Sequence, residues 1–544
     1  MRGLAETTLD AYRAAFLQAV ADGRRRQLVL PQILVGCFLL PILWLAIPHT
    51  RRPWLYQTRW LVIAVALGLN AEQVLRASST NIAGSYSAGL VAAYGSMLCM
   101  HLLVWTRPQF DAARVIKVCR RGASESSKEL TSTDVGAGAG AGAGADVPAD
   151  QGELRCRNRP AGKSTGGRDI DVGNDTSVYE YRWQRFPHNG TFLQRLGWAV
   201  DLILCFRGAG WTWSAPVIPR PRTAGVIRDG DRVDIQSMPR ITTAGYVRKT
   251  TEAEFFQSRL AVMALSCLLL DFLSTFMVKD PYFILGPDGA ASHSHANPWY
   301  IAGLSPWMVQ FYHELFALSG MVSAISAAFA VMDMLQYWVL KTWFPSRCIV
   351  EIFASTFGSL DEVFERGLAG WWGSWWHQSF RQQLLGPSTY LIANGYLRKG
   401  AQSAVVVSLL VSFVQSGILH TAGSLTTLPA TKPWRPMAFF LLQAAGIVVQ
   451  QESARVLGKL LPQLPRRVAR WTNFAFAIVW LYATAPLFID DIAACGIWLL
   501  EPVPVSVFRA LGFGRPGDHW WRWDHHYAPR WFTGRIWYES GVAV

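Results

Sequence analysis

The sequence predicts an all-α, polytopic integral membrane protein with roughly seven to nine transmembrane helices plus interfacial or re-entrant helices. Three observations predict this fold class. Only 16% of the 544 residues are charged, whereas soluble domains carry about 25%, and 51% are hydrophobic. Several apolar runs approach or exceed the about 20 residues that a helix needs to cross a bilayer. Polar segments rich in tryptophan lie between these runs, as is typical of the membrane interface.

The N-terminal part predicts a surface segment followed by transmembrane helices. Residues 1–27 could form an amphipathic helix on the membrane surface, or a solvated terminus. We expect the N-terminal transmembrane helices over residues 28–105. They include the apolar runs Leu28–Ile47 and Gly84–Trp105 and a weaker candidate at Trp60–Leu69.

Residues 106–194 interrupt the apolar pattern. They contain the repeat "GAGAGAGAGA" from Gly136 and many polar residues, so we expect a flexible, low-complexity extramembrane loop. The membrane core is predicted over residues 195–544, with a second polar loop at 215–251.

Further transmembrane helices are predicted inside the core. The apolar runs that indicate them are Leu260–Val278, Met308–Met332, Ala404–Leu419, Pro436–Gln450 and Phe474–Leu500, with a weaker one around Tyr337–Phe357. The segment 357–399 is too polar to span but holds Trp371, Trp372, Trp375 and Trp376. Because tryptophan prefers the interface, we expect a broken or re-entrant element there.

His420 is the first candidate catalytic residue. It ends the uncharged run "AVVVSLLVSFVQSGIL", and ionisable groups at membrane depth usually face a protein interior or a watered cavity. A neutral imidazole can accept a proton from a hydroxyl. The nearby Gln415, Ser416 and Thr421 could orient it. The alternative is a structural histidine bonded to a neighbouring carbonyl.

His377 is the second candidate, within "WWHQSFRQQL". If this stretch is helical, His377 and Arg381 share one face. A cation beside a histidine suits an anionic ligand such as a phosphate-bearing cofactor, and we include Trp376 and Gln378 in this candidate binding set. The alternative is an interfacial helix whose arginine meets lipid headgroups.

Other chemistry is less well supported. The net charge of +14 is not concentrated in a nucleic-acid-binding module, so no nucleic acid partner is expected, and no histidine or cysteine spacing predicts a metal site. Asp271 is an acid at membrane depth that could serve a cavity or, as we expect, pair with Arg259 on the same span.

Taken in order, six segments resemble a known family. They are "LGWAVDLILCFRGAGW", "KDPYF", "WWHQSFRQQL", "SGILHTAG", "FFLLQAAGIVVQQESAR" and "RIWYESGVAV". Together they resemble the membrane-bound O-acyltransferases of the wax-synthase-like branch, and most closely the fungal members that acetylate alcohols on terpenoid natural products. The similar blocks cover roughly residues 190 to 544.

The resemblance implies a catalytic chamber inside a many-helix membrane domain, reached by acyl-CoA from the cytosolic side. The family's membrane-embedded histidine corresponds to His420. The second polar position, often asparagine, corresponds to His377, whose role could be orienting, electrophilic or part of the CoA path. Acyl-CoA would be a co-substrate, with no permanently bound cofactor. The other partners would be a lipophilic alcohol and the lipid bilayer, expected to be that of the endoplasmic reticulum.

The predicted function is therefore transfer of an acyl group, expected to be acetyl, from acyl-CoA to a hydroxyl of a lipophilic alcohol such as a terpenoid intermediate of secondary metabolism. One alternative keeps the fold but uses a long-chain acyl donor and a fatty alcohol, as in a wax synthase. Another is a non-enzymatic multi-pass transporter, which predicts two similar halves; the sequence shows no convincing internal repeat.

Overall fold

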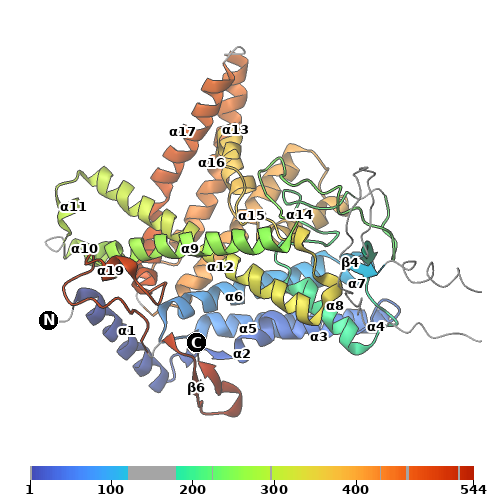
Figure 1. Ribbon diagram of the computed structural model, residues 1–544, viewed down its shortest axis with the longest axis horizontal. Coiled ribbons are helices and arrows are strands. Elements are labelled where there is room, and N and C mark those ends of the chain that lie inside the picture. Colours follow the sequence, from blue (N-terminus) through green and yellow to red (C-terminus); the bar gives the residue numbers. More distant parts are fainter. Residues whose placement is uncertain are drawn as a thin grey trace, which may run out of the picture.

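The computed structural model describes residues 3–119, 179–222, 225–293, 297–428, 431–460, 465–524 and 527–543, and it is mostly helical (Figure 1). The predicted all-α class is thereby confirmed. The glycine-alanine repeat from Gly136 lies outside the described residues. The longer helices are α1 (Leu4–Ala21), α5 (Arg59–Arg76), α6 (Ile82–Met100), α8 (Phe192–Leu204), α9 (Glu252–Met277), α10 (Pro281–Ala291), α12 (Pro306–Trp343), α13 (Asp361–Gly370), α14 (Arg381–Ala393), α15 (Gln402–Thr426), α16 (Trp434–Leu460), α17 (Arg466–Thr484) and α18 (Pro486–Ala494).

Short helices connect these elements. They are α2 (Gln32–Leu34), α3 (Leu40–Ala46), α4 (Pro53–Gln57), α7 (Pro108–Asp111), α11 (Trp299–Ala302) and α19 (Val507–Ala510), the π-helices η1 (Val35–Leu39), η2 (His101–Trp105) and η6 (Trp371–Trp375), and the 3-10 helices η4 (Pro345–Arg347), η5 (Val350–Ile352), η7 (Ile497–Leu499) and η9 (Trp537–Glu539). The predicted polar loop 215–251 contains no helix in its described residues.

Four helical segments are long and apolar enough to cross a bilayer, among the described residues. They are Ile82–Trp105, Glu252–Ala291, Pro306–Trp343 and Gln402–Thr426, and the bent pair α17 and α18 makes a fifth if it is one span. These criteria support a membrane protein but do not reach the predicted seven to nine spans.

The shortfall has a physical reason at the first apolar run. Leu28–Ile47 carries Pro31 and Pro41, and a proline removes a backbone donor and obstructs a continuing helix. The helical part of the run begins after Pro31 and is continuous over α2, η1 and α3, from Gln32 to Ala46. This helix is shorter than the about 20 residues that a span needs.

Three helix pairs organise the interior. Helix α9 packs along α12, and α15 packs against both α6 and α16. The α6 and α15 backbones approach closely at Gly89, where an added Cβ would collide with the backbone of Ala422. Gly423 on α15 likewise faces the ring of Tyr86. These glycines allow two helices distant in sequence to share a tight contact.

Helices α16 and α17 form a hairpin that projects from the body (Figure 1). Helix α13 packs against α17, where the rings of Phe364 and Phe474 stack with centroids 4.4 Å apart. Gln450 of α16 accepts a hydrogen bond from the Leu368 amide of α13 (2.9 Å). The hairpin therefore supports α13 and the π-helix η6 that follows it.

The strands are short. Strands β1 (Arg26–Gln27) and β3 (Ala77–Ser78) pair in parallel, and β4 (Arg114–Cys119) and β5 (Tyr179–Gln184) pair antiparallel. A three-stranded sheet has the order β2-β7-β6, with β2 at Val29–Leu30, β7 at Gly541–Ala543 and β6 at Arg530–Phe532. This sheet joins the two ends of the described chain.

Candidate active site

His420 lies near the C-terminal end of α15, in a cage of aromatic rings. Its Nδ1 lies 3.2 Å from the hydroxyl of Tyr86 on α6. The imidazole stacks on Phe440 with centroids 5.0 Å apart and meets the edge of Phe488 at 4.9 Å. Its Nε2 forms no hydrogen bond with the described residues and keeps some accessible surface. Nδ1 therefore has a hydrogen-bond partner, whereas Nε2 has none among the described residues.

The residues predicted to orient His420 bond elsewhere. Gln415 Nε2 donates to the Leu384 carbonyl of α14 (2.9 Å), and Ser416 Oγ donates one turn back to the Ser412 carbonyl (3.1 Å). Thr421 Oγ1 donates to the Pro433 carbonyl (2.9 Å).

Tyr86 takes the orienting place instead. It was missed because it lies 334 positions away in the sequence, where no local pattern connects it to His420.

His377 lies in a non-helical turn between η6 and α14, because α14 begins only at Arg381. The expected shared helical face of His377 and Arg381 is therefore wrong. His377 Nδ1 lies 3.1 Å from Ser379 Oγ. As in His420, the Nε2 atom forms no hydrogen bond with the described residues and keeps some accessible surface. Burial, with the nearby Arg207 charge, lowers the pKa of His377 to about 4. The imidazole is neutral at physiological pH.

Trp376, Gln378 and Arg381 build this turn. Gln378 Nε2 donates to the carbonyls of Trp372 (3.0 Å) and Trp376 (2.7 Å). Arg381 Nη1 donates to the Gly373 carbonyl and to Gln378 Oε1, both at 2.6 Å. The contacts of Gln378 and Arg381 with the described residues thus hold the backbone around His377 in place.

The two histidines belong to one site. They are far apart in the sequence, but aromatic contacts bring them into one cluster. A continuous series of rings connects them: Phe440 contacts Trp372 at 5.9 Å, Trp372 contacts Trp376 at 5.9 Å, and Trp376 contacts His377 at 5.3 Å. The site is a cluster of aromatic rings that contains two imidazoles, each with its Nδ1 within hydrogen-bond distance of a hydroxyl group.

Asp271 does not pair with Arg259, contrary to expectation. Its carboxylate accepts hydrogen bonds from the Val507 amide (2.6 Å), the Phe508 amide (3.1 Å) and the Ser506 hydroxyl, which stabilises the start of α19. Arg259 instead forms a salt bridge with Asp333 of α12 at 2.9 Å. Both are structural pairings between elements that the sequence could not place side by side.

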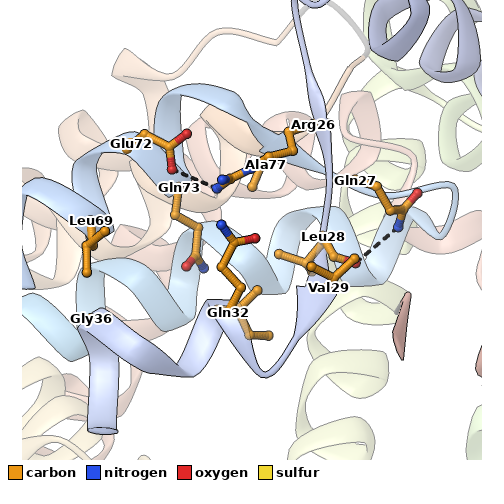
Figure 2. Close-up of a pocket in the computed structure, with 11 residues that line it drawn as sticks. Arg26, Gln27, Leu28, Val29, Gln32, Gly36, Leu69, Glu72, Gln73 and Ala77 are labelled. Carbon is orange, nitrogen blue, oxygen red and sulfur yellow. Dashed lines mark hydrogen bonds and ion pairs between the residues drawn. The ribbon is translucent and has the colours of Figure 1, made fainter. Parts of the chain in front are cut away.

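A separate pocket lies among the N-terminal helices (Figure 2). Arg26 and Glu72 form an ion pair there (2.7 Å), and Gln73 donates to the Ala88 carbonyl (2.9 Å). It contains neither candidate histidine. In the part of the chain that the structure describes, no cluster of three or more histidine, cysteine or acidic residues could hold a metal ion.

Comparison with known proteins places this geometry in context. A family model described as the membrane bound O-acyl transferase family matches residues 353–442, which include His377 and His420. The resemblance to the membrane-bound O-acyltransferases is confirmed. No solved structure gives a significant match.

The curated relatives point the same way. The chain is 25% identical over 275 residues to acetyltransferase ple2 of Rhodocybe pseudopiperita, covering 50% of this chain and 60% of that protein. It is 23% identical to O-Mevalon transferase macI of Penicillium terrestre (53% and 60%) and 24% identical to acetyltransferase eriL of Hericium erinaceus (63% and 79%). The chain thus spans about 60% of the length of the first two relatives. These similarities support the prediction of an acyltransferase.

Proposed function

We propose that this protein transfers an acyl group, of which acetyl is the best candidate, from acyl-CoA to a hydroxyl of a lipophilic alcohol such as a terpenoid intermediate. The observation that supports the proposal is a pair of imidazoles in one cluster of aromatic rings, each with its Nδ1 beside a hydroxyl group and its Nε2 without a hydrogen bond to the described residues. Aromatic walls suit an apolar polycyclic acceptor. The acetyltransferase names of similar proteins support the choice of acetyl.

In this mechanism His420 is the general base. Its Nε2 takes the proton of the acceptor hydroxyl while the hydroxyl oxygen attacks the thioester carbonyl carbon. The carbon–sulfur bond then breaks, and CoA leaves as the thiol after receiving that proton. For Nε2 to accept the proton, Nδ1 must carry its own hydrogen and donate it to Tyr86. General-base catalysis of this kind contributes typically about 10²–10⁴-fold.

His377 would act beside it as a hydrogen-bond donor. Ser379 can donate to His377 Nδ1, which leaves the hydrogen on Nε2, directed at the oxygen that becomes negative as the thioester is attacked. The Trp376, Gln378 and Arg381 turn would border the acyl-CoA and fix His377 against it. In this proposal His420 and His377 contact the reacting atoms, and the turn contacts the acyl-CoA.

The test uses microsomes from a host that expresses the full chain, supplied with labelled acetyl-CoA and a panel of terpenoid alcohols. We expect His420→Ala to abolish ester formation and His377→Ala to lower it at least about 100-fold, with protein level and membrane insertion unchanged. Profiling a strain that lacks the gene should reveal an accumulating alcohol, lighter by one acyl group than the lost product. Full activity of His420→Ala would remove the proposed base.

The same assay separates the alternatives. A preference for long-chain acyl-CoA and fatty alcohols would indicate wax ester synthesis. Absence of any ester product, with uptake of a solute that depends on the protein, would indicate a transporter. We place the enzyme in the endoplasmic reticulum membrane, and co-fractionation with markers of that membrane tests the location.

A further inference from the structure

A second cavity lies between the end of α8 and α12. Its lining comes from three parts of the chain: Asp201 to Ala209, the α12 positions Phe329, Met332, Asp333, Gln336 and Leu340, and Arg347 to Phe353. The α12 positions recur every three or four residues and so form one face of the helix. From Phe329 to Leu340 this face extends about 16 Å along the helix axis.

The cavity contains one arginine without a matching carboxylate. Asp201 pairs with Arg347 (2.8 Å) and Arg114 (3.1 Å), and Asp333 pairs with Arg259 (2.9 Å). Arg207 is 8% exposed and forms no salt bridge within the described residues.

The polar partners of Arg207 are backbone carbonyls. Its Nη1 donates to that of Ser355 (2.6 Å) and its Nη2 to that of Ala354 (2.9 Å). Asp333 lines the same cavity and its charge acts on Arg207, but its carboxylate is already bound to Arg259. Asp201 and Asp333 thus face four arginines, namely Arg114, Arg207, Arg259 and Arg347. Because buried charge is costly unless it is balanced, this excess of positive charge indicates that an anion belongs there.

Arg207 is also close to the candidate active site. Its guanidinium carbon lies 5.5 Å from the centroid of the Phe329 ring, and that ring lies 6.4 Å from His377. The Phe329 ring thus lines the cavity and also contacts His377, so the cavity borders the candidate active site.

We propose that this cavity receives the phosphate-bearing end of acyl-CoA, and that Arg207 binds one of its phosphates. The inference rests on the proposed function and adds the residue that selects the donor. A planar guanidinium suits phosphate because its N–H groups can donate two hydrogen bonds side by side. Arg381, in contrast, is committed to the turn around His377 through its contacts with Gly373 and Gln378.

The test compares two acetyl donors that share the thioester but differ in phosphate. Acetyl-CoA carries phosphates, whereas the acetyl thioester of N-acetylcysteamine carries none. We expect Arg207→Gln to lower kcat/KM for acetyl-CoA by about 10- to 100-fold, chiefly through KM, and to leave kcat/KM for the short thioester unchanged. Glutamine can still donate to a backbone carbonyl, so the segment at Ala354 keeps a contact.

Two control variants sharpen this comparison. Arg207→Lys keeps the charge and should lose less than Arg207→Gln. Arg240→Gln removes an exposed arginine outside the cavity lining and should behave as the wild type with both donors. Equal losses with both donors, or no loss with acetyl-CoA, would overturn the assignment. A wild-type protein that is inactive with every donor would instead contradict the proposed function itself.

A binding measurement keeps the inference testable if the short thioester is a poor donor. Free CoA should bind Arg207→Gln about 10- to 100-fold more weakly than the wild type, with pantetheine binding both equally. A lipid phosphate has the same chemistry as a CoA phosphate. If it were the occupant, CoA affinity would not change, and anionic vesicles would stabilise the wild type but not the variant, which would overturn the proposal.

Discussion

At the scale of single residues, the contact between Tyr86 and His420 has the clearest chemical meaning. The Tyr86 hydroxyl lies 3.2 Å from His420 Nδ1 and comes from a different helix. It determines which way the imidazole faces and can hold the tautomer that leaves Nε2 unprotonated. The sequence identified His420 from its polar character in an apolar run, but a partner on another helix leaves no trace in local spacing.

Removing the Tyr86 hydroxyl therefore isolates this positioning role. If His420 is the base, as proposed, we expect Tyr86→Phe to lower kcat about 10-fold, the value of one hydrogen bond, and to leave KM for acetyl-CoA unchanged. Steady-state kinetics in microsomes measure kcat and KM separately. Tyr396→Phe, at an exposed tyrosine, is the matched control. A change confined to KM would contradict the role.

His377 gives a prediction about pH. Its pKa falls from an ordinary value near 6.5 to about 4 on burial, so the unfolded chain binds more protons than the folded one between these values. Its contribution to the free energy of unfolding is fully present above pH 6.5 and is lost as the pH falls towards 4. His377→Asn, which keeps a donor but does not titrate, should show a shallower loss of thermal stability over this range. Identical slopes would show that His377 is not held neutral by the fold.

At the scale of elements, the site depends on how closely α6 and α15 approach. Both helices were predicted as spans, from Gly84–Trp105 and Ala404–Leu419, and both exist in the structure. Their mutual contact could not be predicted, because a helix that is apolar on every side does not reveal which face meets protein and which meets lipid. The turn at His377 was missed for a related reason: a four-residue spacing fits a helix even where Trp376 and Gln378 form a turn.

The closeness of these helices can be tested with glycine substitutions. Gly89→Ala should force α6 away from the Ala422 backbone, which separates Tyr86 from His420 and lowers both activity and thermal stability. Gly68→Ala on α5 is the matched control, because nothing lies within 4 Å of its added Cβ. There the substitution should stabilise the helix by up to about 1 kcal/mol. Equal effects at the two positions would show that the helix contact does not set the site.

At the scale of the whole molecule, the number of membrane crossings depends on helices near the limits of length and hydropathy. Four spans, or five with the bent pair, satisfy strict length and hydropathy criteria in the described residues. We propose that α5 and α16 also cross, which together with the bent pair brings the total to the lower end of the predicted range. Their charged ends or prolines lower their hydropathy without preventing insertion beside other helices.

Topology mapping checks this count. Glycosylation acceptor sites inserted after α4, between β3 and α6, and between α16 and α17 should be modified in a pattern set by the number of preceding crossings. We expect the reporters on either side of α5 to lie on opposite faces of the membrane. Modification on the same face would limit α5 to a surface or re-entrant position.

The sheet that joins β2 to β7 has a consequence for biogenesis. Val29 and Leu30 near the start of the chain are paired with Val542 and Ala543, which are synthesised only after every candidate span has been made. Until then β2 has no partner strand and its edge stays unpaired. A stalled or shortened translation product should therefore remain a substrate for membrane quality control, even when all of its candidate spans have entered the bilayer.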